Sequence, residues 1–378
     1  MSDPTLRAWA YLSRVAEPPC AELAALVKQV GPVEAAERVR RGQVDNAVSR
    51  HTEARREIDC AAADLALLAG LGGRLITPDD DEWPGLALTA FGDDAAAAKP
   101  QGKPPMVLWA LGPERLDETA QRAAAIVGTR ASTAYGEHVA ADLAAGLTRR
   151  DVAVVSGGAY GIDGAAHRAA LASDGVTVAV LAGGIDILYP AGHSGLLHRI
   201  GRQGLLVTEY PPGVRPARHR FLTRNRLVAA LAGAAVVVEA GLRSGAANTA
   251  AWARALGRVV GAVPGPVASS ASAGCHALLR DGAEVVTRAD DIVEFVGRIG
   301  ELAPDDAHPT TALDGLSDAE RQVYEALPGR GAATIDQIAV AAGRAPARVL
   351  GPLAILEVAG LAERQDGRWR IVRQPRTA

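Results

Sequence analysis

Short apolar runs alternate with alanine-rich segments of helical length through the middle of the chain. Six such runs lie at 123–127, 152–155, 176–181, 205–208, 234–238 and 259–263. Strands that are apolar on both faces are typical of a parallel sheet covered by helices on each side, and the crossover connections of such a sheet are right-handed. The pattern therefore predicts a doubly wound, Rossmann-like α/β domain.

The two ends of the chain follow other patterns. Helical spacing of apolar residues at the N-terminus predicts a helical domain. Near the C-terminus, two helix-capping boxes, a third helical segment and an Asp366-Gly367 hairpin turn predict a winged-helix domain. We expect a helical domain over 1–72, an extended Rossmann-like domain over 73–298, a polar linker over 299–314 and a winged helix over 315–378.

Two segments carry finer predictions. Residues 92–105 combine acids, four alanines and prolines, which predicts a flexible insert. In the winged helix, Gly351-Pro352 predicts a kink in the third helix. Arg348 is the basic residue that this helix would turn toward DNA, so we expect the tail to contact protein rather than to read a groove.

Composition limits the kinds of ligand and cell compartment. The chain has 378 residues, a formal net charge of −3 and three cysteines that match no metal spacing. Because the net charge is slightly negative, any anion site must come from local clustering of charge. Because the cysteines match no metal spacing, no metal is expected, and no cofactor is expected either. The few cysteines favour a reducing cytoplasm. The longest apolar stretch, 227–238, is shorter than the ~20 residues of a membrane helix, so no membrane partner is expected.

Each of five predicted strands ends in a glycine-rich or polar loop. The loops are Gly128–Arg130, Ser156–Asp163, Gly183–Asp186, Glu209–Pro212 and Glu239–Gly245. Because the carboxyl ends of parallel strands share one edge of the sheet, these loops predict one long site. A site with so many glycines and arginines favours a long, negatively charged ligand with an accessible backbone.

The loop after the second strand has the most specific pattern. Gly157, Gly158 and Gly161 stand where a strand turns into a helix, whose free N–H groups can bind phosphate. The spacing differs from the dinucleotide fingerprint. Asp163 and His167 lie one helical turn apart, and we interpret them as a structural pair that locks the loop rather than as a catalytic or metal pair, because no third ligand or nucleophile accompanies them.

The segment from Gly213 to Arg226 is basic and contains no acid. Its arginines are Arg215, Arg218, Arg220, Arg224 and Arg226, and Phe221 stands among them. An acid-free basic run is typical of polyanion binding, and a phenylalanine within it favours base stacking. The alternative is a solvated helix start with Phe221 in the core.

Two weaker signals lie at other strand ends. Gly128-Thr129-Arg130 can hold an anion, although a surface turn with a solvated arginine is an equal alternative. Ser244, Gly245, Asn248 and Thr249 open the helix after the fifth strand. The stretch from 240 to 280 contains no acid and so offers no general base near this loop.

Together these motifs resemble the DprA family, also called Smf, the DNA-processing proteins of bacterial transformation. The resemblance rests on segments that occur in unbroken order: Ile126–Arg130, Val155–Asp163 with His167, Gly183–Asp186 with Tyr189-Pro190, Phe221 with Arg224–Arg226, Ser244-Gly245 with Thr249, Val263–Gly265, and Gly274-Cys275 with Asp281–Ala283. The sequence departs from the family at Leu222, at His276 and at Glu17–Cys20. The resemblance implies an N-terminal helical domain of the SAM or helix-hairpin-helix type, but because of the last departure we do not expect that domain to bind DNA.

The resemblance implies a protein without catalytic activity that binds single-stranded DNA, dimerises through its Rossmann-like domain and loads the recombinase RecA. The positions that match the family's DNA-binding pocket are Gly128, Thr129, Arg130, Ser156, Gly157, Gly158, Arg218, Phe221, Arg224, Asn225, Arg226, Ser244, Gly245 and Thr249. Asp163, His167 and Asp186 match motif positions that we interpret as structural.

One alternative comes from another class of protein. Related Rossmann-like folds act on nucleoside monophosphates and release the base, and glycosidic chemistry needs an acid at the cleaved bond. Asp163, Glu209 and Glu239 are the weak candidates for that acid. A protein-interaction scaffold without any DNA binding is a third interpretation.

Overall fold

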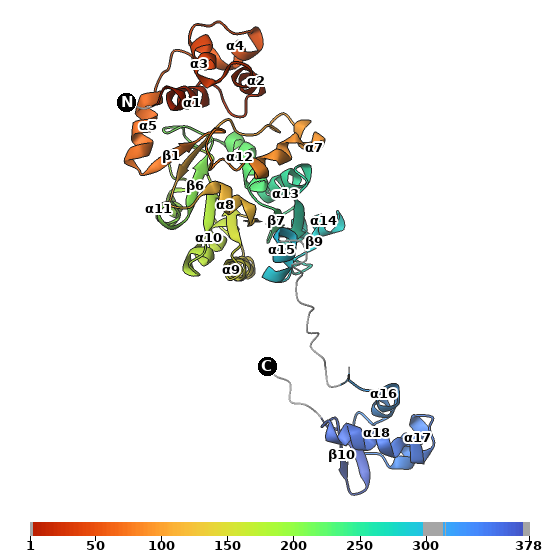
Figure 1. Ribbon diagram of the computed structural model, residues 1–378. Coiled ribbons are helices and arrows are strands. Elements are labelled where there is room, and N and C mark those ends of the chain that lie inside the picture. The colour runs from red at the N-terminus through yellow and green to blue at the C-terminus, as the bar shows by residue number, and fades with distance from the viewer. Residues whose placement is uncertain (1–2, 298–312, 314, 373–378) are drawn as a thin grey trace. The chain divides into compact units, whose positions relative to one another are not determined.

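The computed structural model describes residues 3–297, 313 and 315–372. The chain divides into two compact units at residues 303 and 304 (Figure 1). The expected linker over 299–314 lies outside the described residues except for Leu313. Each unit has a hydrophobic core of its own.

A nine-stranded sheet forms the centre of the first unit, and its strands lie in the order β1-β2-β6-β5-β4-β3-β7-β8-β9. The bounds are β1 (Gly73–Ile76), β2 (Leu108–Leu111), β3 (Ala123–Val127), β4 (Ala153–Ser156), β5 (Thr177–Val180), β6 (Leu205–Thr208), β7 (Ala234–Val237), β8 (Val259–Ala262) and β9 (Glu284–Val285). The six predicted strands are β3 to β8, and they pair in parallel. The predicted fold class is therefore confirmed. Sequence patterns missed the antiparallel strands β1 and β2, of which β1 is at the edge of the sheet, and the two-residue edge strand β9.

The direction of strand order reverses between β3 and β7. Strands β3, β4, β5 and β6 follow one another toward one edge, whereas β7, β8 and β9 continue toward the other. In a doubly wound sheet, such a reversal opens a crevice outside the carboxyl ends of the two central strands. The topology thus places a crevice beside the loops that follow β3 and β7.

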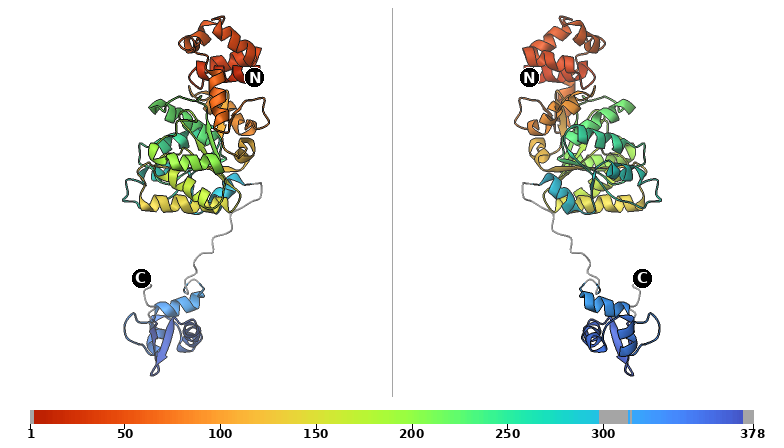
Figure 2. Two further views of the ribbon diagram at one scale, coloured as in Figure 1. Left: turned by 90° about the vertical axis from the view of Figure 1, so that its left-hand side faces the viewer. Right: turned by 90° about the vertical axis from the view of Figure 1, so that its right-hand side faces the viewer.

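Helices cover both faces of the sheet (Figures 1 and 2). One face packs against α12 (Arg218–Ala230) and α13 (Gly245–Ala255). The opposite face packs against α9 (Ala134–Thr148), α10 (Ile162–Ala172) and α15 (Ala289–Val296), while α11 (Ser194–Gln203) lies farther along it. Two further short helices of this unit are α8 (Leu116–Gln121) and α14 (Ala273–Arg280).

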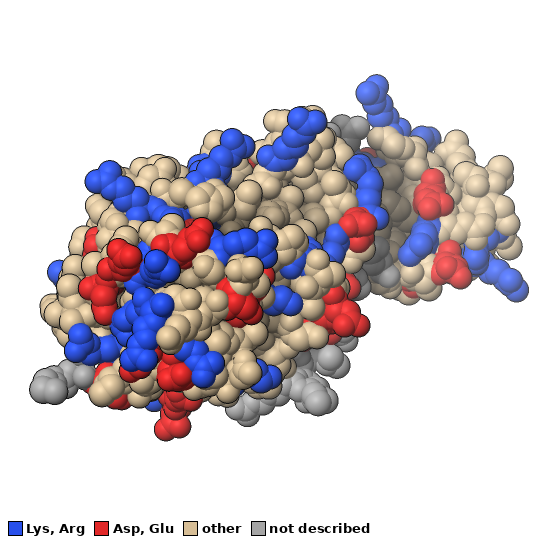
Figure 3. Space-filling model, turned by 90° about the horizontal axis from the view of Figure 1, so that it is seen from above, with Lys and Arg blue, Asp and Glu red and all other residues tan. Residues whose placement is uncertain are grey.

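The N-terminal helices share a hydrophobic cluster with the sheet. They are α1 (Pro4–Val15), α2 (Ala21–Val30), α3 (Pro32–Arg40), α4 (Asn46–Thr52) and α5 (Ala61–Gly70). Leu12 and Leu23 belong to the same buried cluster as Trp109 and Leu206 of the sheet. In Figure 3, which looks onto these helices, basic and acidic side chains are interspersed. This face therefore carries no broad field of a single sign.

The segment 92–105 packs against the body of the unit. It contains the short helix α7 (Asp94–Ala97), which follows α6 (Gly85–Leu88) and a 3-10 turn at Thr89–Gly92. The Lys99 ammonium lies 4.5 Å from the centre of the Trp252 ring and donates a hydrogen bond to the Ala251 carbonyl at 3.2 Å. These contacts anchor the segment to α13. The sequence pattern that predicted a flexible insert gave no sign of them.

The second unit is a winged helix built from α16 (Asp318–Glu325), α17 (Ile335–Ala341), α18 (Pro346–Val358) and the hairpin β10 (Ala362–Gln365) and β11 (Arg368–Ile371). Both predicted capping boxes are present. Asp366 and Gly367 have φ values of 51° and 75°, as a tight hairpin turn requires. Helix α18 includes Pro352 in its interior. The kink that the sequence predicts at this proline stays a prediction.

Among the described residues, no single helix is long and apolar enough to cross a membrane. Helices α17 and α18, which meet at 101°, pass that test as a bent pair on length and composition alone. Ile338 and Leu353 of these two helices are fully buried in the core of the winged helix. That core accounts for part of their apolar character.

Candidate nucleic-acid interface

A pocket of about 910 Å³ lies at the reversal in strand order. The loops that follow β3, β4 and β7 form part of its wall, and the rest comes from α12, from the start of α13 and from the connections after β5 and β6. Its lining includes Gly128, Thr129, Arg130, Gly157, Ala159, Asp163, Tyr189, Arg218, Phe221, Arg224, Asn225, Arg243, Ser244, Gly245 and Thr249. Most of the residues that the sequence assigned to a DNA site therefore come together here, although they are spread over more than a hundred positions.

Arg130 and Phe221, two central residues of the predicted DNA site, are in contact. The Arg130 guanidinium lies 5.2 Å from the centre of the Phe221 ring. The Tyr189 ring packs beside Phe221 with its centre 5.5 Å away. Phe221 is half-buried, whereas Tyr189 is largely exposed. A guanidinium and two aromatic rings thus form one cluster on the pocket wall, with faces available for stacking.

The pocket carries an excess of positive charge. Arg130, Arg218 and Arg243 are exposed on its wall, and Arg224 lies buried beneath it. Asp163 is the one carboxylate among the described residues that line it. Arg243 was not among the predicted site residues, although its place between the β7 strand and Ser244 was a usable signal.

The loop after β4 is held from below by Asp163. The Asp163 carboxylate accepts hydrogen bonds from the N–H groups of Gly157 at 3.1 Å and Ala159 at 3.3 Å. The Ser156 hydroxyl donates to the Ile126 carbonyl at 2.6 Å and is fully buried. Of the predicted Ser156–Gly158 set, Gly157 alone lines the pocket. The prediction that this loop offers free N–H groups to phosphate is therefore wrong for Gly157 and Ala159, because an internal carboxylate already occupies them.

Gly157 leaves room for the side chain of Arg224. A Cβ atom on Gly157 would lie 2.1 Å from the Arg224 Nη1 atom. Arg224 donates to the Val180 carbonyl, and burial lowers its pKa to about 10 although Asp163 opposes that shift. Burial likewise raises the pKa of Asp163, with Arg224 and the loop N–H groups opposing it. Arg224 is therefore a buried cation under the floor of the pocket rather than a freely exposed one.

His167 has a structural environment. Its Nδ1 atom lies 2.7 Å from the Thr177 hydroxyl, and that hydroxyl donates to the Val154 carbonyl at 2.9 Å. Because the hydroxyl proton is used on Val154, the Nδ1 atom of His167 must donate. Burial, with smaller contributions from His193 and Arg224, lowers the pKa of His167 to about 3. A neutral imidazole that joins α10 to β5 fits a structural role for His167. The expectation that it locks the loop together with Asp163 is wrong, because the loop N–H groups bond to Asp163 and His167 bonds to Thr177.

Asp186 also makes a structural contact. Its carboxylate accepts a hydrogen bond from the Gly213 N–H at 2.8 Å, and the Gly184 N–H donates to the Val214 carbonyl at 2.7 Å. The segment before α12 thus packs on the loop that follows β5. The predicted strand-end segments Gly183–Asp186 and Glu209–Pro212 do not line the pocket, although Tyr189, which follows β5, and Pro216 and Ala217, which follow β6, do. The expectation that all five strand-end loops form one site is therefore wrong for these two segments, while every one of the five connections contributes to the lining.

Arg226 does not line the pocket, which corrects its assignment to the DNA site. Its side chain is 0% exposed, and its Nη2 atom donates to both carboxylate oxygens of Glu209, at 2.7 and 2.8 Å. The guanidinium lies 5.3 Å from the centre of the Phe91 ring. Arg226 therefore points from α12 toward the strand β6 end, where it forms a buried ion pair.

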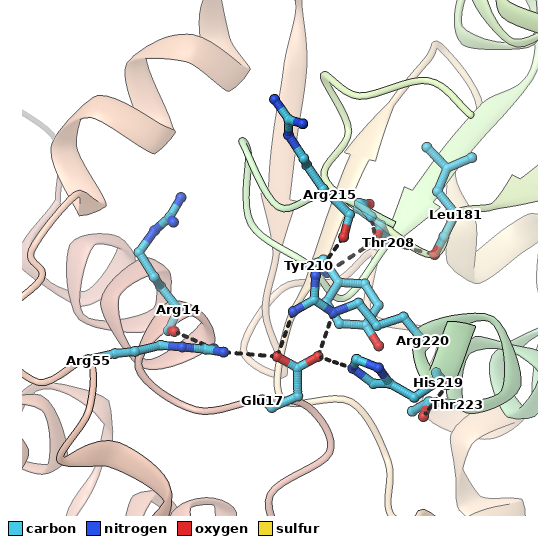
Figure 4. Close-up of polar contacts among 11 residues, drawn as sticks. Arg14, Glu17, Arg55, Leu181, Thr208, Tyr210, Arg215, His219, Arg220 and Thr223 are labelled. Atoms are coloured by element: carbon cyan, nitrogen blue, oxygen red, sulfur yellow. Dashed lines mark hydrogen bonds and ion pairs between the residues drawn. The ribbon is translucent and has the colours of Figure 1, made fainter. Parts of the chain in front are cut away.

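Arg220 is also held by an acid from elsewhere in the chain. Glu17 accepts its hydrogen bonds at 2.6 and 2.9 Å, and the same carboxylate lies 3.1 Å from Arg55 and 3.4 Å from His219 (Figure 4). Burial by itself would raise the pKa of Glu17, but Arg220 and Arg55 outweigh burial and hold this pKa below its ordinary value. The contact fixes the N-terminal helices to the start of α12.

The helix α13 begins at the opposite wall. The Ser244 side chain accepts a hydrogen bond from the Ala247 N–H at 3.4 Å and caps the helix. The Asn225 side chain donates to Asn248 at 3.2 Å and to the Gly245 carbonyl at 3.4 Å. Asn225 and Thr249 are buried, so they shape the wall and tie α12 to α13.

The candidate acids for hydrolysis are occupied. Glu239 accepts hydrogen bonds from the Thr133 N–H at 2.9 Å and from its hydroxyl at 2.6 Å, and Glu209 pairs with Arg226. Both are buried and neither lines the pocket. Asp163 does line it, but its carboxylate holds the loop. The described lining therefore has an excess of arginines and no carboxylate free of an internal partner.

Within the described part of the chain, one group of side chains has a spacing that could accommodate a metal ion. Ligand atoms of Cys20, Glu22 and His51 lie within 4.8 Å of one another, and none of these residues lines the pocket. Glu22 lies 3.7 Å from His51 and accepts a weak hydrogen bond from the Cys20 thiol at 3.7 Å. These two contacts around one carboxylate account for the arrangement.

The fold and the pocket define a doubly wound α/β protein with an arginine-lined crevice at its switch point and a winged helix at its C-terminus. The model of the DNA recombination-mediator protein A family matches residues 74–297, and the DprA winged-helix model matches residues 307–368. The chain belongs to the DprA/Smf family. The family resemblance seen in its motifs is thereby confirmed.

Individual relatives agree with this assignment. A putative DNA processing protein DprA of Mycobacterium tuberculosis is 80% identical over 99% of this chain and 96% of its own length. Protein Smf of Escherichia coli is 37% identical over 62% of this chain and 64% of its own length. The X-ray structure of DNA processing protein A from Streptococcus pneumoniae has a TM-score of 0.58 at 26% identity and covers 77% of this chain and 97% of that one.

Proposed function

We propose that this protein binds single-stranded DNA in the switch-point pocket and passes it to RecA during natural transformation, without catalysing a reaction. The observation that carries the proposal is the contact of Arg130 with Phe221, beside Tyr189, on the wall of a cationic pocket. Unpaired bases stack on aromatic rings whatever their sequence, while arginines hold the backbone phosphates. Double-stranded DNA keeps its bases stacked internally and gains less from such a wall.

The expected salt dependence follows from the exposed arginines. Arg130, Arg218 and Arg243 can each reach a phosphate from the pocket wall, whereas Arg224 is buried and Arg220 and Arg226 are paired with acids. Three phosphate contacts correspond to a log–log slope of about −2, from roughly −0.7 per phosphate on single strands. A slope near zero would contradict phosphate binding.

Mutation of the pocket wall tests the DNA site. Arg130→Ala and Phe221→Ala should each weaken binding to an oligothymidine by about 1–3 kcal/mol, in a fluorescence-anisotropy titration. Arg202→Ala is a matched control, because Arg202 is exposed on α11 and lies outside the pocket. Circular dichroism melting separates loss of binding from loss of folding, since Phe221 is half-buried. Unchanged affinity of both variants would reject the site.

The handover to RecA, dimerisation through the Rossmann-like domain and action in the cytoplasm are the finer parts of this proposal, and membership of the family supports them. We expect sedimentation to find a dimer of the full chain. We also expect the protein to speed RecA assembly on single strands coated by a single-strand-binding protein, and Arg130→Ala to remove that effect. Release of free base from nucleotides would instead support an enzyme and contradict the non-catalytic role.

A further inference from the structure

Helix α18 of the winged helix is apolar on two opposite faces. Its inner face places Val349, Leu353 and Leu356 in the core, where all three are 0% exposed. Its outer face presents Leu350 and Ile355, which are 49% and 50% exposed. Such a helix face is unusual on a soluble domain, because large exposed apolar residues that lie together mark interaction surfaces.

The middle of that outer face is a stripe that can pair with itself. Ala347, Gly351, Ala354 and Val358 follow one another at intervals of three or four residues, so they lie in line on the helix, and all are exposed. Val358 is 91% exposed. The stripe is symmetric about its midpoint, since Gly351 and Ala354 are equally distant from it, as are Ala347 and Val358. In an antiparallel pair of these helices, Gly351 of one copy would face Ala354 of the other at the crossing. Toward each end, the small Ala347 would face the larger Val358.

The two charges on the helix are placed against its own dipole. Arg348 lies in the first turn, next to the positive end, and Glu357 lies in the last turn, next to the negative end. In an antiparallel pair, Arg348 would be level with the negative end of the partner helix and with its Glu357. The charges that are unfavourable within one copy thus become complementary between two copies.

We propose that the outer face of α18 docks against the same face of a second copy of this chain, antiparallel, about a two-fold axis. A two-fold interface must be self-complementary, and both the apolar stripe and the charges of α18 meet that requirement. The contact involves one short helix from each copy, so it is weak by itself and gains strength wherever the two chains are already held together. The proposal concerns the tail alone and does not depend on DNA binding by the pocket.

The test is a cross-link that recognises the antiparallel register. Full-length chains that carry Ala347→Cys and chains that carry Val358→Cys are co-expressed with different tags, and both also carry Cys60→Ser, because Cys60 is partly exposed while Cys20 and Cys275 are buried. In the proposed pair, residue 347 of one copy faces residue 358 of the other. Like positions lie about 16 Å apart along the helices at 1.5 Å per residue, well beyond the reach of a disulfide.

Mild oxidation should therefore yield covalent dimer from the mixed chains, several-fold more than from either variant expressed alone. Adding Arg348→Glu to both chains should lower that yield several-fold, because it places two acids at the same level of the pair. The same substitution should not lower the melting temperature of the protein, since an acidic residue in the first turn favours the isolated helix. Loss of cross-linking after Arg348→Glu therefore does not reflect loss of folding.

Three results would overturn the proposal. Equal cross-linking by each variant alone would indicate a parallel or non-specific contact. Absence of mixed cross-link, together with binding to lipid vesicles that Ile355→Glu abolishes, would assign the face to a membrane surface. Absence of mixed cross-link, together with binding to a DNA duplex that Arg348→Ala abolishes, would assign it to a DNA groove.

Discussion

The buried pair of Arg226 and Glu209 gives the sharpest prediction, because the sequence pattern assigned Arg226 to the DNA site and the structure places it in the core. The two side chains are 0% and 2% exposed and share two contacts of 2.7 and 2.8 Å. Removing one partner of a buried ion pair leaves the other charge without compensation, which costs about 3–5 kcal/mol. We therefore expect Glu209→Gln to lower the free energy of unfolding by about 3 kcal/mol at pH 7.

Replacing Arg226 should lower the free energy of unfolding by a smaller amount, and that amount should depend on pH. In Arg226→Met, the remaining carboxylate of Glu209 can take up a proton, because burial raises its pKa and the opposing arginine is gone. The destabilisation of the Arg226→Met variant relative to the wild type should therefore decrease as the pH falls from 8 to 5. The Glu209→Gln variant has no such relief, because an arginine keeps its charge throughout this range. The double replacement Arg226→Met with Glu209→Leu should recover most of the stability, since both charges are then absent.

Two assays separate structure from binding. Urea unfolding followed by circular dichroism measures the free energy of unfolding, and a titration with labelled oligothymidine below the unfolding transition measures DNA affinity. We expect Arg226→Met to change DNA affinity by less than about 0.5 kcal/mol, in contrast to about 1–3 kcal/mol for Arg130→Ala. An Arg226→Met protein of normal stability that no longer binds DNA would refute this reasoning and restore the assignment made from the sequence.

Other predictions concern groups that hold the body together. The pKa of His167 is about 3 in the folded protein, below its unfolded value of roughly 6.5. The contribution of His167 to the free energy of unfolding is therefore complete above pH 6.5 and falls by about 2 kcal/mol at pH 5. His167→Asn should remove that part of the pH dependence in urea titrations. The pKa of Glu17 lies below its ordinary value of 4.5, so its ion pairs stabilise the protein above about pH 4.5 and are lost on further acidification; the difference in unfolding free energy between wild type and Glu17→Gln should narrow from pH 6 to pH 3.5. Gly157→Ala should displace Arg224, lower the stability by about 1–3 kcal/mol and weaken DNA binding, while Gly195→Ala, which has open space for its Cβ, should leave both unchanged or slightly improve stability in calorimetry and anisotropy.

Most of the fold could be predicted from local pattern. The apolar runs located β3 to β8 within one or two residues, and capping boxes and a hairpin turn located the winged helix. Those signals are local, because a strand buried on both faces, a capped helix start and a positive-φ turn each constrain a few neighbouring residues. The antiparallel strands β1 and β2 gave weak signals, since their pairing depends on partners far along the chain.

The site was predicted in part, for a related reason. Strand-end position correctly grouped Arg130, Phe221 and Ser244, because a parallel sheet brings its carboxyl ends to one edge. The loop after β4 was misjudged, since the Asp163 carboxylate already takes N–H groups that the sequence left free. A side chain that competes with a ligand for the same donors becomes visible only when its direction is known.

What the sequence determined by itself was the doubly wound domain, the winged helix and a basic segment beside the switch point. Only the tertiary structure decided which arginines of that segment face the pocket. Glu17 reaches Arg220 across 203 positions, and Glu209 meets Arg226 inside the core. The basic segment 213–226 contains no acid, but acids from other parts of the chain neutralise part of its charge. The reason is that the interaction of two charges depends on their distance and burial and not on their order along the chain.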